Sequence, residues 1–133
     1  MQTSFTDKQL QNKDNKTSET IIRKCVHCGM CNATCPTYGI NGEELEGPRG
    51  RIYLIKDMLE NKKPATKEIA KHIDSCLSCY SCMTTCPSGV NYMHLIDHGR
   101  NYVEETYKRP FLDRLFRNIL SFVLPRPKIF LLM

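Results

Sequence analysis

Apolar residues recur at helical spacing in several segments of the chain. Residues 51–60 and a second segment from Thr66 to about Asp74 each place apolar side chains on one face, which predicts two short amphipathic helices. Thr66 is a suitable N-cap for the second of them. No segment shows the strict two-residue alternation of a half-buried strand, so the pattern predicts a mostly α fold. The side chains expected to face inward are Ile52, Ile55, Leu59, Ile69, Ala70 and Ile73.

Two longer helices are predicted toward the carboxyl end of the chain. The first spans about residues 91–108 and ends before Pro110, because proline disfavours a continuing helix. The second, residues 111–124, carries an unbroken apolar stripe opposite a polar face, and prolines separate it from the terminal residues 128–133. The inward-facing positions are Leu95, Ile96, Val103 and Tyr107 in the first helix, and the stripe of the second consists of Leu112, Leu115, Phe116, Ile119, Leu120 and Val123.

The remaining segments are polar or rich in glycine. Residues 1–20 carry few apolar side chains, which predicts a flexible amino-terminal arm or a short helix. Residues 38–50 contain four glycines and one proline, the composition of a loop. We therefore divide the chain into the arm, a central domain over residues 21–108 and an amphipathic basic tail over residues 109–133. Because the chain has no tryptophan and a negative mean hydropathy, its core is modest, and a bound cofactor is expected to help stabilise it.

All eight cysteines fall in two runs, CVHCGMCNATCP from residue 25 and CLSCYSCMTTCP from residue 76. A shift of 51 residues superposes the four cysteines of the first run, and the proline that follows them, on those of the second. No apolar stretch near the amino terminus is long enough for an export signal or a membrane span. We therefore expect a cytoplasmic protein, in whose reducing surroundings clustered thiols are metal ligands rather than disulfides.

Each run has the spacing C-x2-C-x2-C-x3-C-P, which is typical of proteins that hold [4Fe-4S] clusters. Each iron of such a cluster takes one thiolate, and the first three cysteines of a run are close enough together to supply three of the four. In two-cluster ferredoxins the last cysteine of each run ligates the other cluster. We therefore predict two [4Fe-4S] clusters. The first is held by Cys25, Cys28, Cys31 and Cys86, and the second by Cys76, Cys79, Cys82 and Cys35.

Structural zinc and disulfides are the alternative uses of these cysteines. Zinc sites usually combine two C-x2-C pairs separated by a loop, whereas each run here has three evenly spaced cysteines and a fourth before proline. Disulfides would suit an exported protein. Because cysteine ligates every iron in the predicted clusters, neither offers an open site for a substrate. One-electron transfer is the remaining function, and we predict no catalytic residue in this chain.

Several charged and aromatic side chains lie close to the runs in sequence. Positive side chains are mostly exposed in proteins, so we expect those near the runs to be solvated rather than to tune a cluster. Tyr38 and Tyr92 follow the two runs and are positioned to shield the clusters, although packing alone explains a tyrosine there. We assign no role to His94 and His98, because the cysteines already account for the cofactors. The candidates for tuning are His27, Lys24, Arg23, Arg49 and Arg51.

The net charge of +5 comes from the carboxyl end of the chain. Residues 1–107 contain 13 basic and 13 acidic side chains, whereas residues 108–133 contain six basic and one acidic. No basic stretch interleaved with aromatic residues occurs in the first hundred residues, so we predict no nucleic-acid binding. The basic tail has two interpretations, peripheral binding to an anionic membrane surface or packing on protein, and we favour packing.

The segment CVHCGMCNATCPTYGINGEELEGPRGRIYLIKDMLE, with CLSCYSCMTTCPSGVNYMHLIDHGR, resembles the amino-terminal part of the iron-sulfur subunit of glycolate oxidase (glycolate dehydrogenase). The cysteine runs alone also resemble other iron-sulfur subunits, including that of succinate dehydrogenase. The additional segment EGPRGRIYLIKDMLE narrows the resemblance to the glycolate oxidase subunit. The resemblance implies an alpha-helical ferredoxin domain. It also implies a separate flavin-containing subunit that oxidises glycolate, and transfer of the electrons toward the respiratory chain at the inner face of the cytoplasmic membrane.

Members of that family continue into cysteine-rich repeats, so the resemblance also implies that residues 109–133 begin a carboxy-terminal region missing from this chain. Two alternatives stay open, a truncated product or fragment and a short protein that kept only the ferredoxin part. Two other functions stay open at this point. One is a free-standing ferredoxin-like carrier that serves several partners. The other is the iron-sulfur subunit of a related lactate or glycerol-3-phosphate dehydrogenase.

Overall fold

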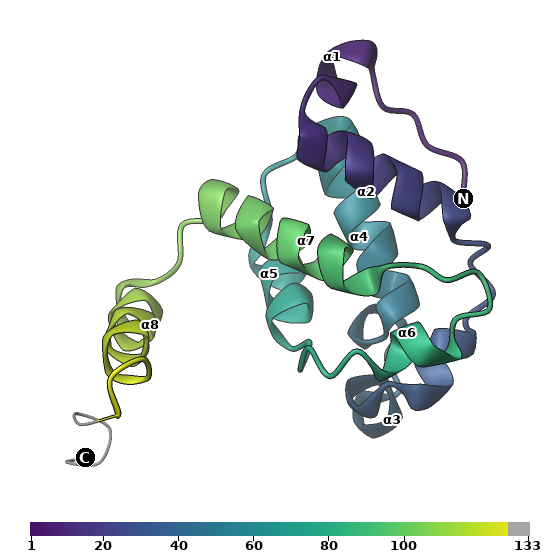
Figure 1. The fold of residues 1–133 in the computed structure, drawn as a ribbon. Coiled ribbons are helices and arrows are strands. Elements are labelled where there is room, and N and C mark those ends of the chain that lie inside the picture. Colours follow the sequence, from purple (N-terminus) through teal and green to yellow (C-terminus); the bar gives the residue numbers. More distant parts are fainter. Residues whose placement is uncertain (128–133) are drawn as a thin grey trace.

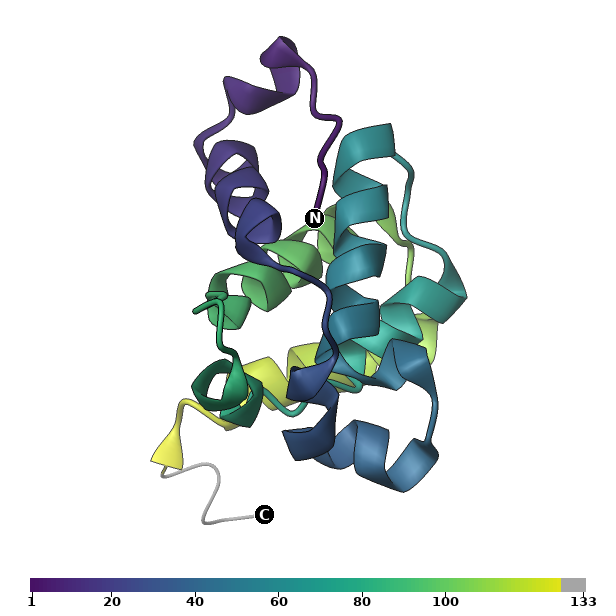
Figure 2. The ribbon, with the colours of Figure 1, turned by 90° about the vertical axis from the view of Figure 1, so that its right-hand side faces the viewer.

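The computed structural model describes residues 1–127. Buried apolar side chains form one core cluster in this part of the chain. Four helices enclose it: α2 (Lys13–Lys24), α4 (Pro48–Asn61), α5 (Lys67–Asp74) and α7 (Tyr92–Thr106). Helix α7 contacts each of the other three, and Figures 1 and 2 show the cysteine-bearing segments gathered at one end of this bundle. The described residues contain no strand, which confirms the predicted mostly helical fold.

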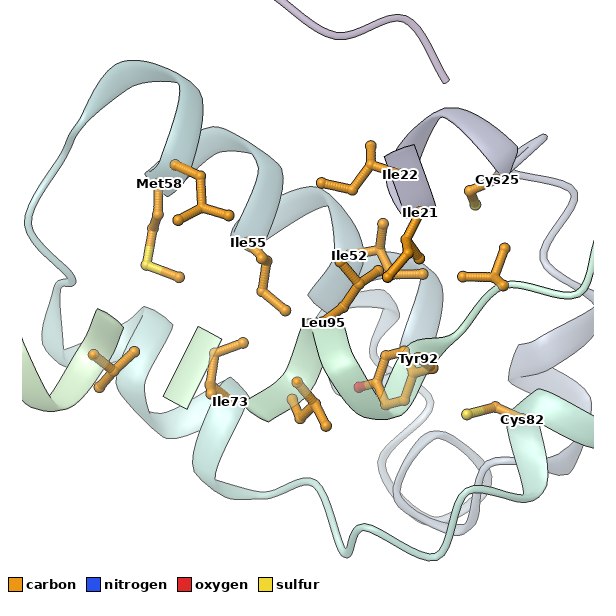
Figure 3. Close-up of a cluster of buried hydrophobic side chains, with 14 of the residues drawn as sticks. Ile21, Ile22, Cys25, Ile52, Ile55, Met58, Ile73, Cys82, Tyr92 and Leu95 are labelled. Carbon is orange, nitrogen blue, oxygen red and sulfur yellow. The ribbon is translucent and has the colours of Figure 1, made fainter. Parts of the chain in front are cut away.

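The buried faces of the helices follow the predicted apolar spacing (Figure 3). Ile55 of α4, Ile73 of α5 and Leu95 of α7 are fully buried in this core. Burial of one aliphatic side chain of this size contributes roughly 1.5–3 kcal/mol, so the core makes a large stabilising contribution. All residues predicted to face inward in α4, α5 and α7 are buried, except Ile69 and Tyr107, which are half-buried.

Capping residues fix where the helices begin and end. Thr66 accepts a hydrogen bond from the backbone N–H of Ile69 at 3.3 Å, which confirms it as the N-cap of α5. Helix α4 begins at Pro48, earlier than the predicted start at residue 51, because proline suits the first turn of a helix. That helix ends before Lys62, which adopts the left-handed conformation with a φ of 49°.

Part of the loop predicted over residues 38–50 is helical. Helix α3 (Pro36–Asn41) follows the first cysteine run, and the short 3-10 helix η2 (Glu44–Glu46) precedes α4. The prediction of a continuous loop was wrong because Pro36 opens a helix here, at a position where its missing N–H costs nothing. Gly42, with a φ of 65°, then ends that helix.

Residues 1–20 include two helical segments that pack against the core, which agrees with the short helix and not with the flexible arm that their polar composition predicted as alternatives. They include α1 (Asp7–Leu10) and the first part of α2. Gln9 is buried, and its Nε2 donates to two main-chain carbonyl oxygens at the end of α4, each at 2.9 Å. Ser18 is also buried, with its Oγ 2.7 Å from Nδ1 of His98. The polar side chains that suggested solvation therefore take part in buried hydrogen bonds.

The close crossing of α4 and α7 depends on Gly99. A Cβ atom at this position would lie 2.8 Å from Cγ1 of Ile55, whose side chain is fully buried. We expect Gly99→Ala to destabilise the protein by about 1–3 kcal/mol, the usual cost of overpacking a core, and to lower the midpoint of anaerobic thermal unfolding. Gly39→Ala is the matched control, because a Cβ atom there meets nothing within 4 Å. Equal midpoints for the two variants would contradict this explanation.

Helix α8 (Phe111–Val123) stands apart from the four-helix core (Figure 1). Arg117 of α8 pairs with Asp74 of α5 at 2.9 Å, and Arg109, which precedes α8, pairs with the same carboxylate at 2.6 Å. The predicted helix is confirmed. Its apolar stripe, Val123 excepted, faces solvent in the described part of the chain.

Among residues 1–127, no helix is both long enough and apolar enough to span a bilayer. The predicted terminal segment, residues 128–133, lies outside the described residues. In the described part of the tail, the surface that could bind a membrane or pack on protein is the exposed apolar stripe of α8. Its exposed members are Leu112, Leu115, Phe116, Ile119 and Leu120.

Candidate iron-sulfur centres

The two cysteine runs adopt the same backbone path. Each run has a left-handed residue just before its second cysteine and another just after it. Where residues with a left-handed backbone conformation alternate with right-handed ones, neighbouring N–H groups turn toward one side. They form a concavity that binds anions, including iron-sulfur clusters. Each run then continues into a short helix, so the sequence duplication is also a structural one. The left-handed residues are His27, Gly29, Ser78 and Tyr80, and the short helices are η1 (Met30–Thr34) and α6 (Ser81–Thr85).

Two adjoining cavities lie between the runs. The first encloses about 440 Å³ and the second about 300 Å³, open solvent included. Cys82, Pro48 and Tyr92 line both cavities, so the cavities share a wall. No disulfide joins any of the cysteines, and their assignment to particular clusters stays a prediction. The predicted ligands fall into two groups: Cys25, Cys28, Cys31 and Cys86 line the first cavity, and Cys76, Cys79, Cys82 and Cys35 line the second.

Equivalent residues of the two runs meet between η1 and α6. Oγ1 of Thr85 donates to Oγ1 of Thr34 at 3.3 Å, and the shift of 51 residues superposes these two threonines. A contact between equivalent residues is the geometry that a two-fold relationship produces. A two-fold relationship also explains why the last cysteine of each run lines the cavity of the other run.

Burial and mutual proximity oppose ionisation of Cys31 and Cys82. Burial, together with the neighbouring cysteines, raises the pKa of Cys31 to about 11 and the pKa of Cys82 to about 12. Thiols with such pKa values stay protonated at neutral pH unless a cation lies among them. Iron supplies that positive charge, and thiolate is the ligand that [4Fe-4S] clusters require. The donor set therefore fits two such clusters, and iron binding is expected to release protons.

Each cavity has an edge that faces solvent, and equivalent residues form the two edges. Cys28 and Cys79, which the shift of 51 residues superposes, are the two exposed cysteines. Val26 and Leu77, also equivalent, line their cavities with exposed fractions of 68% and 66%. A centre that exchanges electrons with other molecules needs such an edge, and here each cavity has its own.

Residues 21–90 match the family model of the 4Fe-4S dicluster domain. The chain belongs to this family. The match covers more than half of the chain and contains both cysteine runs, so the predicted cofactors, two [4Fe-4S] clusters, are confirmed. The predicted helical ferredoxin-type fold is confirmed as well, because the described residues are helical and the match begins in α2 and ends after the second run.

Three relatives are similar to this dicluster chain over most of its length. It is 52% identical to the glycolate oxidase iron-sulfur subunit of Escherichia coli (strain K12) over 98% of the chain, and 33% identical to the probable glycolate oxidase iron-sulfur subunit of Bacillus subtilis (strain 168) over 83%. It is 30% identical over 62% to the mitochondrial succinate dehydrogenase iron-sulfur subunit of Candida glabrata. The chain spans 32%, 25% and 35% of the lengths of these relatives. No solved structure is significantly similar to it.

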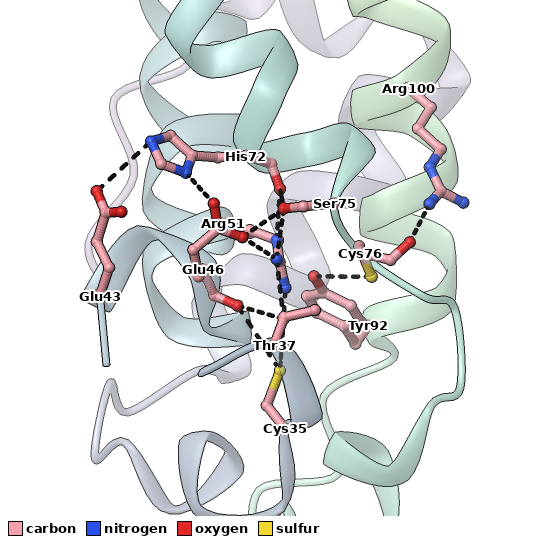
Figure 4. Close-up of polar contacts among 10 residues, drawn as sticks. All are labelled: Cys35, Thr37, Glu43, Glu46, Arg51, His72, Ser75, Cys76, Tyr92 and Arg100. Carbon is pink, nitrogen blue, oxygen red and sulfur yellow. Dashed lines mark hydrogen bonds and ion pairs between the residues drawn. The ribbon is translucent and has the colours of Figure 1, made fainter. Parts of the chain in front are cut away.

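Arg51 is buried beside the second cavity of the dicluster domain, so the prediction that it is solvated was wrong. Its side chain is 1% exposed, and Figure 4 shows it surrounded by hydrogen-bond acceptors. Nε donates to the carbonyl oxygen of His72 at 2.6 Å, and Nη2 donates to Oε2 of Glu46 at 3.0 Å. Nη2 also donates to the hydroxyls of Thr37 and Ser75, at 3.1 and 3.0 Å. A buried guanidinium is tolerated here because its N–H groups have partners.

Glu46 is the counter-ion of Arg51 and is buried with it. Burial alone would raise the pKa of this carboxyl, but hydrogen bonds from Ser75 and His72 and the charge of Arg51 hold the pKa below its usual value. Glu43 lies close to the same histidine. Both oxygens of Glu46 already accept hydrogen bonds, so we interpret this group as a structural network and not as a metal site.

Tyr92 lies between the two cavities and is 4% exposed. Its hydroxyl donates to Sγ of Cys76 at 3.7 Å, and burial raises the pKa of the hydroxyl, which keeps it protonated as a donor. Tyr38, the other tyrosine singled out in the sequence, is half-buried and does not line either cavity. Of the two tyrosines, Tyr92 is therefore the one placed to exclude water from both sites.

The other charged candidates differ in their distance from the cavities. Arg49 and His27 line the first cavity. Arg23 of α2 pairs with Glu19 one turn earlier in the helix, and the side chains of both Arg23 and Lys24 are exposed, as expected for solvated side chains. Sequence reasoning missed the buried partners of Arg51, because nothing in the composition around residue 46 or residue 72 marks those side chains as buried.

Proposed function

We propose that this chain relays single electrons as the iron-sulfur part of a flavin-dependent glycolate dehydrogenase (glycolate oxidase). The observation that supports this most strongly is the 52% identity to the Escherichia coli glycolate oxidase iron-sulfur subunit over 98% of the chain. When bound, each [4Fe-4S] cluster accepts and releases one electron. A separate flavin-containing subunit oxidises the 2-hydroxy acid, and this chain carries no catalytic residue.

We also propose the ligand sets. Cys25, Cys28, Cys31 and Cys86, which line the first cavity alone, hold one cluster. Cys76, Cys79, Cys35 and Cys82, which line the second cavity, hold the other, and of these only Cys82 also borders the first cavity. The support is the lining of the two cavities and the contact between equivalent threonines, which together fit a crossed, two-fold arrangement. The solvent-facing edges at Cys28 and Cys79 support a relay with one partner at each edge.

The partner is tested by affinity purification under anaerobic conditions from cells that make the complex, with the tag on this chain. We expect a flavin-containing protein to be retained, and addition of glycolate to bleach the visible absorbance of the clusters. Lactate and glycerol 3-phosphate, added to the same preparation, test the related dehydrogenases. A chain that loads its clusters but retains no flavoprotein and is not reduced by glycolate would contradict the proposal.

A free-standing carrier is the second candidate function, and the exposed stripe of α8 weighs against it. Six apolar side chains of this helix, from Phe111 to Leu120, are at least 44% exposed, and soluble monomers seldom expose a contiguous patch of this kind. We propose that α8 packs on a protein partner. Flotation with anionic vesicles at low salt tests the alternative, since we expect the chain to stay in the soluble fraction and recovery with the vesicles would favour membrane binding.

Zinc is the remaining alternative for the cysteines. Metal and sulfide analysis of the anaerobically purified protein distinguishes zinc sites from iron-sulfur clusters. A [4Fe-4S] cluster contains equal amounts of iron and acid-labile sulfide, whereas a zinc site contains no sulfide. We expect about eight of each per chain, from two clusters of four irons. Stoichiometric zinc without sulfide would overturn the proposed function.

We propose a cytoplasmic location, at the inner face of the cytoplasmic membrane where the electrons reach the respiratory chain.

A further inference from the structure

One segment supplies an arginine to each cavity. Residues 44–51 contain two arginine–glutamate pairs with the same spacing of five residues, Glu44 with Arg49 and Glu46 with Arg51. Nη2 of Arg49 donates to Oε2 of Glu44 at 2.9 Å, and Nη2 of Arg51 donates to Oε2 of Glu46 at 3.0 Å. Both arginines lie in the first turn of α4, two positions apart, so their side chains leave the helix in different directions.

The positive member of each pair faces a cavity and the negative member does not. Arg49 lines the first cavity and Arg51 lines the second, whereas neither Glu44 nor Glu46 lines either one. Nη1 of Arg51 lies 4.0 Å from Sγ of Cys35. Each pair is neutral as a whole, but its positive end is the nearer one to the cysteines. A positive charge at this distance stabilises the added negative charge of a reduced cluster.

The two arginines differ in burial. The side chain of Arg51 is 1% exposed, and that of its partner is 3% exposed. The side chain of Arg49 is 30% exposed, and that of its partner is 44% exposed. Solvent screens the charge of Arg49 more effectively, so its effect on a nearby cluster is weaker. A further arginine, Arg100, donates to the carbonyl oxygen of Cys76 at 2.6 Å but does not line the cavity.

We propose that Arg49 and Arg51 tune the two clusters separately, each raising the reduction potential of the cluster in the cavity it lines, with the larger effect from Arg51. The inference rests on the proposed ligand sets, since Cys35 is the ligand that Arg51 approaches. The proposed function is thereby extended to two side chains that make the reduction potentials of the two clusters differ. Neither arginine gains or loses a proton or an electron in this role, because guanidinium stays charged throughout the accessible pH range.

The test is a redox titration of the loaded protein under anaerobic conditions, followed by electron paramagnetic resonance. We expect Arg51→Gln to lower one midpoint potential and Arg49→Gln to lower the other by a smaller amount. Glu46→Gln removes the negative end of the buried pair, so we expect it to raise the midpoint that Arg51→Gln lowers. A merely structural role for the pair predicts no such reversal of sign. Arg117→Gln on α8 is the matched control and is expected to move neither midpoint.

Some outcomes would overturn the inference. If Arg51→Gln and Arg49→Gln both contain two clusters and their midpoints match the unchanged protein, or if both shift the same midpoint, the arginines do not act separately. If Arg51→Gln fails to load because Glu46 is then buried without its counter-charge, the double variant Glu46→Gln/Arg51→Gln replaces it, and its midpoint is expected below that of Glu46→Gln. An unchanged protein without iron and sulfide would overturn the proposed function as well, whereas loaded clusters with unmoved midpoints would overturn this inference alone.

Discussion

Replacement of Cys86 by alanine is expected to remove the cluster of the first cavity and to leave that of the second, although Cys86 belongs to the second run. Each iron needs its thiolate, and Cys86 lines the first cavity together with the leading cysteines of the first run. Iron and sulfide should fall from about eight to about four per chain, since one cluster of four irons is lost. Metal analysis and electron paramagnetic resonance of the reduced protein measure the loss.

Two matched variants show which cluster is lost. Cys28→Ala should remove the first cluster and Cys79→Ala the second, whether or not the ligands cross between runs. With crossed ligands, the signal that remains in Cys86→Ala matches the signal in Cys28→Ala. A remaining signal that matches Cys79→Ala instead would show that each run holds its own cluster with all four cysteines, and would contradict the proposed ligand sets.

Removal of both clusters is expected to unfold the cysteine-bearing end of the molecule and to spare the four-helix core. The elements around the cavities, η1, α3, η2 and α6, have three to six residues each, too few to persist without the contacts that the clusters make. The core of α2, α4, α5 and α7 buries its own apolar side chains and does not need the clusters for that burial. Cluster loss should therefore produce a partly folded protein.

Hydrogen exchange measured by mass spectrometry, with and without chelation of the iron, separates these regions. In the apo protein, residues 25–47 and 76–90 should exchange with an opening free energy near zero, as frayed segments do. The middle of α4 and of α7 should keep most of its protection, because Ile55 and Leu95 stay buried there. Retained protection across residues 25–47 would show that the clusters do not hold this end together.

The sequence predicted helices well where one apolar face meets one core. The α4, α5 and α7 segments have a simple 3.6-residue period, and the residues predicted to face inward are buried or half-buried. The grouping of the first three cysteines of each run also follows from local information, because the spacing within a run fixes which three share a turn. Gly29 was a visible sign of the left-handed conformation, but its equivalent, Tyr80, was not, since tyrosine seldom adopts a positive φ.

Burial of polar residues could not be predicted, because it depends on partners that are distant in sequence. The buried side chain of Gln9 donates hydrogen bonds to two carbonyl oxygens about 50 positions away in the sequence. The buried side chain of Arg51 donates to the carbonyl oxygen of His72, 21 positions away. The sequence therefore left residues 1–20 open between a flexible arm and a short helix, and the positive charge of Arg51 predicted a solvated side chain. The amphipathic pattern of α8 predicted a helix, but a single chain's pattern does not identify the surface on which such a helix packs.

The most direct test of the crossed arrangement is anomalous scattering at the iron absorption edge, from crystals grown anaerobically. We predict two groups of four irons in adjoining cavities. One group lies against Cys25, Cys28, Cys31 and Cys86, and the other against Cys76, Cys79, Cys82 and Cys35. A group of irons enclosed by the four cysteines of a single run, or anomalous peaks from zinc alone, would contradict it.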